Sequence, residues 1–436
     1  MGRVKRANAG AAATGTSGAG AHPPARRGHN AARVLDLLRT AGSEGISRLE
    51  LAERTGLTPQ AVSKITARLR ADGLAAEAGR RASTGGKPRT VLRLVPDAGH
   101  AIGVHLDRDE LRAVLVDLTG AVRAERRVPL DLGAGAEAVV AAVVREVDAL
   151  RGPGAGWPGA GQLGDGRPGV GSPGGGPSDA GLPRGRRPGV GPSGAGPSGV
   201  GSRGVGPSGV GLLGVGVALP GPLDHARGVL HRVTGFPEWD GFPLRDTLVR
   251  HLDGLPVVVD KDTNAAALGL AVAAPGDGHQ AQSFAYLHFG AGLGGGLVIG
   301  GAVHRGARTG AGEFGHQVVQ LDGPPCGCGN RGCVEALCLA AVARGDIEEA
   351  ARVLGTGTGN LVALLDIDLI LLGGRIVATA PDRFVGGVAA ALTDRARRTG
   401  GTAVPVRLVP GGGREVAEGA AQLLLAPLFG RGDGGG

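Results

Sequence analysis

The sequence predicts an α/β protein in two parts, an N-terminal winged helix–turn–helix domain and a larger α/β domain behind it. Helix caps and apolar residues at helical spacing mark the first part, and buried strands alternating with helical stretches mark the second. Residues 1–95 hold 17 of the 47 Lys and Arg residues but 6 of the 39 Asp and Glu residues, which leaves 30 basic and 33 acidic residues in the remainder. A basic module on a near-neutral body is typical of a DNA-binding head on a soluble sensor, the alternative being a solvated basic surface.

The first 28 residues are rich in Gly, Ala and Arg and show no hydrophobic period. Such a stretch buries too little apolar surface to fold, so we expect a disordered basic tail over residues 1–28. Its basic residues could contact DNA or could simply increase the solubility of the chain.

Residues 29–95 have the pattern of a winged helix–turn–helix. A helical period of apolar residues runs from Ala31 to Leu38. Ser47, with a glutamate three residues later, forms the capping box of a second helix. Thr58 caps a third helix, and a proline at its first helical position supports that start.

The third helix is the expected recognition helix, which enters the major groove of DNA in this fold. Val62, Ile65 and Leu69 should face inward, while the polar residues, Thr66 included, are left on outward or terminal positions. Gln and Ser can contact base edges, and Lys and Arg mostly contact phosphates. The candidate DNA-binding residues of this helix are Thr58, Gln60, Ser63, Lys64 and Arg68.

A basic hairpin follows the third helix. Two strand-like runs, residues 74–79 and 90–95, are joined by a Gly-rich basic tip. Such a tip is a wing that can reach phosphates or the minor groove. Its candidate DNA-binding residues are Arg81, Lys87 and Arg89. The alternative for the whole domain, a helical protein-interaction module, does not account for a basic wing at this place.

The second domain, residues 99–436, contains strands that alternate with helices. Residues 100–116 predict two strands around a turn, and residues 137–150 predict a helix. More than half of positions 151–210 are Gly or Pro. Such a composition cannot offset its chain entropy by burial, so we expect residues 151–211 to form a disordered surface insertion.

Three of the four cysteines lie close together in a Gly-rich turn. Cys326, Cys328 and Cys333, with His316 upstream, provide the donor set of a tetrahedral zinc site, and we expect one structural Zn²⁺ there. The Cys-x-Cys spacing differs from the Cys-x-x-Cys of redox dithiols. Ordinary buried cysteines are a further alternative. Cys338 could replace His316 as the fourth ligand, although its place in the following helix favours a core position.

The stretch around these cysteines resembles the ROK family of repressors and sugar kinases. The family pattern is Glu-x-Gly-His, a spacer, and Cys-x-Cys-Gly-x-x-Gly-Cys-x-Glu. It is matched by Glu313, Gly315, His316, Cys326, Cys328, Gly329, Gly332, Cys333 and Glu335. The resemblance covers nearly the whole chain except the tail and the insertion. It implies a two-lobed, actin-like and ribonuclease H-like ATPase-type domain, in which Glu313, His316 and Glu335 contact sugar hydroxyls beside the zinc.

Residues 257–269 resemble the family segment Asn-Asp-Ala-Asn-Ala-Ala at the end of a strand. Asp262 falls on the position that is the catalytic base in the family's kinases. A carboxylate there can accept a proton from a sugar hydroxyl or simply a hydrogen bond. A helix N-cap explains Asp262 equally well. The candidate effector-binding residues are therefore Asp262, Glu313, His316 and Glu335.

The phosphate-binding turns of the family's kinases are altered in this chain. The pattern Asp-x-Gly-Gly-Thr-Lys falls on residues 105–110, where Asp107-Arg108-Asp109-Glu110 replaces the glycines, the Thr and the Lys. Ala291 replaces the Thr of a second Gly-rich turn. Carboxylates repel phosphate, so we expect no enzyme activity and no catalytic residue.

The expected function is a sugar-responsive DNA-binding transcriptional regulator, a repressor of carbohydrate-metabolism genes. One alternative is an ATP-dependent, glucokinase-like sugar kinase that carries a DNA-binding domain. Another is a regulator whose sugar site has decayed. A sugar-binding Asn of the family is missing before Trp239, and the helical segment after the cysteines is short, which motivates this last alternative.

The expected partners are double-stranded operator DNA, a sugar or sugar derivative, and further copies of the chain in a homodimer or homotetramer. Cysteines committed to metal indicate a reducing, cytoplasmic location. We expect no secretory signal, because the basic N-terminus lacks an apolar segment. The longest apolar run, residues 361–372, is too short to span a bilayer, so we expect no membrane association.

Overall fold

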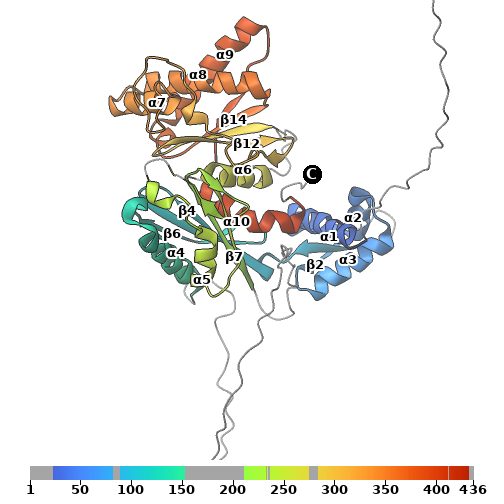
Figure 1. Ribbon diagram of the computed structural model, residues 1–436. Helices are drawn as coiled ribbons and strands as arrows, with labels where there is room; N and C mark the ends of the chain where they lie inside the picture. Colours follow the sequence, from blue (N-terminus) through green and yellow to red (C-terminus); the bar gives the residue numbers. More distant parts are fainter. Residues whose placement is uncertain are drawn as a thin grey trace, which may run out of the picture.

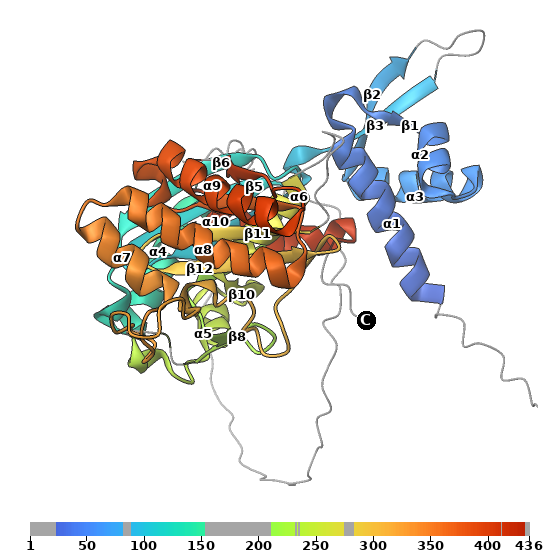
Figure 2. The same cartoon turned by 90° about the horizontal axis from the view of Figure 1, so that it is seen from above.

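The computed structural model has two α/β lobes with a small head beside them (Figures 1 and 2). The described residues are 23–81, 89–152, 211–231, 233, 236–273, 283–410 and 412–431. The predicted fold class, a winged helix–turn–helix followed by a two-lobed α/β domain, is confirmed. Most of the predicted tail and insertion lies outside the described residues. Within those residues, every helix is too short or too polar to cross a membrane.

The head has three helices and a small antiparallel sheet. They are α1 (Pro23–Thr40), α2 (Arg48–Thr55) and α3 (Pro59–Ala71), with the strands β1 (Ile46–Ser47), β3 (Arg89–Leu94) and β2 (Ala75–Arg81) in that sheet order. Both predicted caps are confirmed. The Ser47 side chain accepts the N–H of Glu50, and the Glu50 carboxylate accepts the N–H of Ser47 at 2.8 Å. The Thr58 hydroxyl accepts the N–H of Ala61 at 3.3 Å.

Three details of the head differ from the prediction. Helix α1 begins at Pro23, inside the stretch expected to be disordered, because proline fits the first turn of a helix, where no N–H donor is needed. Thr66 is buried rather than outward, since its hydroxyl donates to the carbonyl of Val62 at 2.9 Å and needs no water. Ile65, expected to face inward, is only half-buried.

The first lobe is built on a five-stranded mixed sheet. Its order is β10 (Val257–Lys261), β7 (Gly211–Leu219), β4 (Gly99–Leu106), β5 (Glu110–Asp117) and β6 (Val122–Pro129). The strands β10, β7 and β4 are parallel, while β5 and β6 are antiparallel to their neighbours. Helices α4 (Ala136–Arg151) and α5 (Leu244–His251) pack on the outer face, where Val and Leu side chains form one buried cluster. A two-stranded ribbon, β8 (Leu223–Asp224) and β9 (Val229–Leu230), follows β7.

The second lobe repeats the arrangement with a second five-stranded sheet. Its order is β13 (Ala302–Val303), β12 (Leu293–Ile299), β11 (Phe284–Phe289), β14 (Leu369–Gly373) and β15 (Val406–Leu408). Helices α7 (Val334–Ala343), α8 (Ile347–Leu365) and α9 (Pro381–Thr399) cover its outer face (Figure 1).

Two helices, α6 (Asp262–Ala273) and α10 (Glu415–Leu425), lie between the two sheets (Figure 1). Their small residues form a buried cluster with residues of both sheets. Helix α10 lies against strand backbone: a Cβ added at Gly103 would lie 1.9 Å from the carbonyl oxygen of Ala417, and one at Gly216 would lie 1.8 Å from that of Ala420. Glycine is therefore required beneath α10.

The head is docked on the end of α10 (Figure 2). Leu38 of α1 and Leu425 of α10 belong to one buried cluster that also contains residues of β4 and β5. The guanidinium of Arg431, after α10, donates to the Asp36 carboxylate at 2.9 Å. The head and the first lobe thus share a continuous core.

The close approach of α10 predicts a strong effect of one added methyl group. Gly103→Ala should lower the free energy of unfolding by about 1–3 kcal/mol, because the Cβ meets backbone that cannot move aside. Gly386→Ala is the matched control, since nothing lies within 4 Å of a Cβ at this exposed position of α9. It should be neutral or slightly stabilising. Urea denaturation measures both, and equal stability of the two variants would contradict the close packing.

Candidate functional site

A pocket of about 90 Å³ lies in the cleft between the two lobes. All four residues predicted to bind an effector line it, namely Asp262, Glu313, His316 and Glu335. The first lobe contributes Asp262 and the turn after β4. The second lobe contributes the other three residues and the Gly-rich turn between β11 and β12. The four predicted residues that the fold brings together are up to 73 positions apart in the chain.

Backbone contacts fix two of these carboxylates. Asp262 is the first residue of α6, directly after β10, and one of its oxygens accepts the N–H of Thr263 at 2.6 Å. Glu335 lies in the first turn of α7, and its Oε2 accepts the N–H of Leu293 at 2.7 Å. Carboxylates are favoured at helix N-termini by the helix dipole. Asp262 therefore lies in the first turn of its helix, where a carboxylate is favourable, and it also lines the pocket.

Lys261 joins the pocket although the sequence analysis did not single it out. Its ammonium donates to the carbonyl oxygen of Ala311 at 2.5 Å and to Oε1 of Glu313 at 3.1 Å. The Lys261 side chain is 4% exposed and the Glu313 side chain 45% exposed. The sequence did contain a signal for this pair. Lys261 ends a buried strand, and a buried lysine needs an acidic partner.

The predicted metal ligands form a compact cluster behind the pocket. One donor atom from each of His316, Cys326, Cys328 and Cys333 lies within 4.8 Å of the others. Nδ1 of His316 is 3.6 Å from Sγ of Cys326, and the sulfurs of Cys328 and Cys333 are 3.7 Å apart. Since Nδ1 is the nitrogen that faces the sulfurs, Nε2 of His316 is left for the pocket.

Cys338 takes no part in this cluster. Its thiol donates to the carbonyl oxygen of Ala350 at 3.4 Å, and it is buried between α7 and α8. Burial raises the pKa of the Cys338 thiol to about 12, so it stays protonated. The alternative in which Cys338 replaces His316 as a ligand is therefore wrong, because its helix places it in the core.

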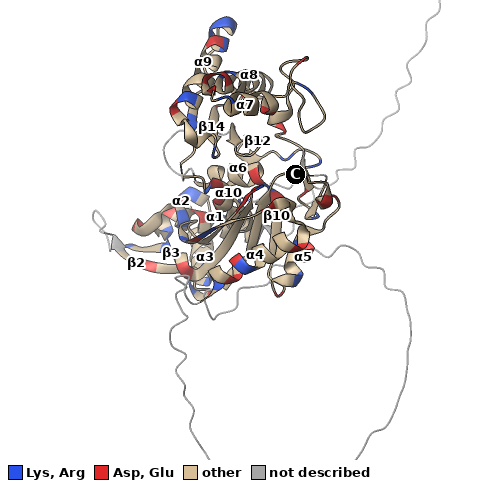
Figure 3. Ribbon diagram, turned by 90° about the vertical axis from the view of Figure 1, so that its left-hand side faces the viewer, with Lys and Arg blue, Asp and Glu red and all other residues tan. Residues whose placement is uncertain are grey.

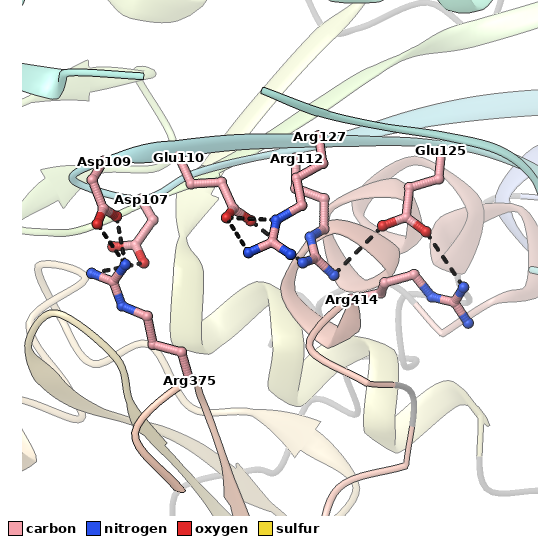
Figure 4. A network of polar contacts seen from close by, with 8 residues as sticks. All are labelled: Asp107, Asp109, Glu110, Arg112, Glu125, Arg127, Arg375 and Arg414. Atoms are coloured by element: carbon pink, nitrogen blue, oxygen red, sulfur yellow. Dashed lines mark hydrogen bonds and ion pairs between the residues drawn. The ribbon is translucent and has the colours of Figure 1, made fainter. Parts of the chain in front are cut away.

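A second cavity of about 430 Å³ adjoins the first and is lined by both lobes. Several of its lining residues form ion pairs (Figure 4). Nη1 of Arg375, after β14, donates to both oxygens of Asp109 at 2.7 and 2.6 Å, and Nη2 is 3.9 Å from Asp107. This pairing with Asp109 raises the pKa of Arg375. It connects the second lobe with the turn that replaces the phosphate loop.

The ion pairs continue along the first sheet (Figure 4). Glu110 accepts from Arg127 at 2.7 Å and from Arg112 at 3.4 Å. Arg112 also lies 3.5 Å from Glu125, which in turn accepts from Arg414 just before α10. The carboxylates of the altered turn are thus balanced by arginines. Spacing in the sequence did not indicate these pairs, and Arg375 lies 266 positions from Asp109.

Buried polar residues lie beside the second cavity. The Tyr286 hydroxyl is 2.7 Å from Nδ1 of His288 and donates to Oε1 of Glu415, the first residue of α10, at 3.0 Å. Burial, followed by the Glu415 charge, raises the pKa of Tyr286 well above its usual value. Burial, followed by His288, lowers the pKa of His105. Tyr286 therefore stays protonated, and His105 is held in its neutral form.

The predicted DNA-binding residues lie on exposed parts of the head. Thr58, Gln60, Ser63, Lys64 and Arg68 are exposed on α3, and Arg89 is exposed at the start of β3. Arg81 ends β2, while Lys87 lies outside the described residues. Helix α3 carries Lys and Arg but no Asp or Glu. The helices α4, α5 and α9 of the two lobes carry both basic and acidic residues (Figure 3).

Two family descriptions match the chain. Residues 33–75 match a winged helix–turn–helix DNA-binding domain, and residues 207–344 match the ROK family. The glucokinase of Thermotoga maritima is 39% identical over 137 residues, which are 31% of this chain and 42% of that enzyme. The xylose repressor of Caldicellulosiruptor bescii is 26% identical over 70% of this chain and 62% of its own length. The chain thus spans less than half of the glucokinase that it matches.

Solved structures share the fold. A ROK family transcriptional regulator, described as a homologue of the E. coli MLC protein, aligns over 93% of this chain and 98% of its own, with a TM-score of 0.64 and 19% identity. A Streptomyces griseus ROK glucokinase in complex with glucose and AMPPNP aligns over 75% of this chain and 99% of its own, with a TM-score of 0.53 and 24% identity. The regulator's alignment thus extends over more of this chain than the kinase's does.

The cysteine cluster predicts a bound metal ion. Purified protein should contain about one ion per chain, and Cys326→Ser with Cys328→Ser should remove it and lower the melting temperature, because two of four ligands are lost. Cys338→Ala should keep the metal, since Cys338 lies outside the cluster. Elemental analysis by mass spectrometry measures the metal content. Full metal retention in the double variant would show that the cluster is not the site.

Proposed function

Because this chain joins a winged helix–turn–helix domain to a ROK-family domain, we propose that it is a sugar-responsive, DNA-binding transcriptional repressor of carbohydrate-metabolism genes. The observation that carries the proposal is the pairing of two surfaces in one molecule: a cleft pocket lined by carboxylates and an imidazole, and an exposed polar α3 on the head. The match to a xylose repressor over most of this chain supports it.

The pocket residues suit a polyhydroxylated ligand. Carboxylate oxygens accept hydrogen bonds from neighbouring hydroxyls, as Asp262, Glu313 and Glu335 would do for a sugar. His316 would contribute Nε2 from the opposite side of its ring. The residues of the cluster fit a structural Zn²⁺: for metal–sulfur bonds of about 2.3 Å, a tetrahedron has edges of about 3.8 Å. The observed sulfur–sulfur distance of 3.7 Å is close to that value. The nitrogen–sulfur distance of 3.6 Å is shorter, as the shorter zinc–nitrogen bond requires.

A bound zinc would orient His316 and the Cys-rich loop from which the pocket is built. An imidazole fixed through one nitrogen presents the other in a set direction. The zinc would therefore support effector binding without contacting the effector.

The proposed DNA-binding unit is a dimer on a two-fold symmetric operator, in which α3 lies in the major groove and the wing contacts the backbone. Effector and operator binding would be coupled reciprocally. Helix α10 offers the physical connection, because Glu415 at one end joins the cleft and Leu425 at the other joins the head's core.

A sugar kinase with a DNA-binding head is the second candidate. Asp262 in the pocket and the glucokinase match favour it. Against it, transfer of a phosphoryl group depends on positioning and charge neutralisation around that group. The turn at Asp107–Glu110 carries carboxylates already paired with Arg375 and Arg127, and Ala291 provides no hydroxyl. We therefore assign no catalytic role to Asp262.

The proposed operator contacts make distinct predictions. Arg89→Ala should weaken binding to all DNA sequences and lower the slope of affinity against salt by about one, because a phosphate contact is lost. Gln60→Ala and Ser63→Ala should change the preference among sequences instead. Fluorescence anisotropy with labelled DNA measures both effects, with Arg397→Ala on α9 as a control. Unchanged salt dependence in Arg89→Ala would contradict the wing contact.

The effector assignment is tested by release from operator DNA. A panel of sugars should include at least one that releases the protein, and Asp262→Asn should require a higher sugar concentration, because a hydrogen-bond acceptor is weakened. A coupled assay with ATP should detect no turnover with any of these sugars. Turnover that needs both ATP and Asp262 would instead support the kinase.

A further inference from the structure

We propose that the cleft pocket takes an uncharged sugar rather than a sugar phosphate or a sugar acid, and that Lys261 positions Glu313 to bind it. This inference rests on the proposed function, since it names the class of effector for the same pocket. Two independent features carry it: the charges that line the pocket and the geometry of the buried lysine.

The charges that line the pocket are mainly negative. Four carboxylates and two cations line it, namely Asp107, Asp262, Glu313, Glu335, Arg108 and Lys261. The excess is therefore two negative charges, and one remains even when Arg375, 3.9 Å from Asp107, is counted. A divalent ion held by three thiolates would add no positive charge. The electrostatic field therefore disfavours an anionic ligand.

Charged and neutral ligands should differ strongly in their affinity for such a pocket. A phosphate monoester carries about −1.5 to −2 charge at neutral pH, and its oxygens are acceptors that carboxylates cannot serve. Like charges also interact more strongly in a partly desolvated cleft than in water. A neutral hydroxyl donates to a carboxylate without that cost. The pocket is thus suited to a ligand rich in hydroxyls and free of charge.

Lys261 is built into the pocket rather than attached to its surface. Its stem passes beside Gly221, where a Cβ would lie 3.0 Å from Cδ of Lys261. Two of its three N–H groups serve the Ala311 carbonyl and Glu313. Because the Ala311 carbonyl also holds the ammonium, its position does not depend on Glu313 alone.

The ion pair limits the freedom of Glu313. A glutamate that is 45% exposed would otherwise sample several rotamers. With Oε1 paired to Lys261, Oε2 is free to accept a sugar hydroxyl from a fixed position. Preorganisation of this kind raises affinity because less conformational entropy is lost on binding. Lys261 is therefore a positioning residue that acts through Glu313 and offsets one of the four negative charges.

The ligand class is tested on the unaltered full-length protein. Isothermal titration calorimetry should compare neutral aldopentoses and aldohexoses with the 6-phosphate and the aldonic acid of each hexose. The neutral sugar that binds best should bind at least about tenfold more tightly than its phosphate or acid, a difference of about 1.4 kcal/mol. Tighter binding of a phosphate or an acid would overturn the inference. Failure of every compound would overturn the proposed function itself.

The role of Lys261 is tested by a double-mutant cycle. Lys261→Met and Glu313→Gln should each weaken sugar binding by about tenfold, and the double variant should lose little more than either single one, because the residues act as a unit. Lys261→Arg should restore most of the affinity. Additive losses, or unchanged affinity in Lys261→Met, would show that Lys261 does not act through Glu313.

Controls separate positioning from folding. Metal content and the far-ultraviolet circular dichroism spectrum of Lys261→Met should match those of the unaltered protein, because Met keeps the length of the buried stem. Arg383→Met removes an exposed cation, 3.5 Å from Glu348 on the outer helices, and should leave sugar affinity unchanged. If Lys261→Met does not fold, Lys261→Gln combined with Glu313→Gln measures the same coupling, because Gln removes the charge but can still donate to the Ala311 carbonyl. The comparison of ligand classes requires no variant.

Discussion

The close contact between α10 and the first sheet is the constraint on which the rest of the structure depends. Carbonyl oxygens of α10 lie where the Cβ atoms of Gly103 and Gly216 would be. At that distance, the small residues of α10 form one core with α6 and the second lobe, and another with the head. Head, first lobe and second lobe therefore all pack on this helix. A shift of α10 changes the packing of all three.

The cleft contains a pocket of hydrogen-bond acceptors next to a turn of paired charges. Its carboxylates and imidazole still converge on one pocket, and they can accept hydrogen bonds from hydroxyls. In the neighbouring turn, the side chains of Asp109 and Glu110 form ion pairs with arginines. In this part of the cleft, the guanidinium of Arg375 is paired with the carboxylate of Asp109. Such a site suits a ligand rich in hydroxyls, and its excess of carboxylates disfavours a phosphoryl group.

Local spacing accounts for what the sequence could predict. The caps at Ser47 and Thr58 and the Cys-x-Cys turn are set by residues a few positions apart, and the structure places all of them as expected. The cations that pair with the cleft carboxylates could not be predicted from local spacing. Arg375 pairs with a residue 266 positions away, and Lys261 meets Glu313 only after the two lobes assemble. Thr66 was misplaced because a threonine in a helix can satisfy its own hydroxyl through the preceding turn.

Under the proposed function, coupling between the pocket and DNA would pass through packed helices, because the α3 residues proposed to bind DNA do not line the pocket. Asp262 lies at the start of α6, which packs along α10, and Glu415 ties the start of α10 to Tyr286 in the cleft. The far end of α10 lies in the core of the head. A close-packed interior passes on small displacements rather than absorbing them. In that proposal, an effector would need to favour one position of α10 by only about 1–3 kcal/mol to change operator affinity by roughly 5- to 150-fold. The glycines that bring α10 onto the sheet would then matter to the proposed switch as much as the residues proposed to bind its two ligands.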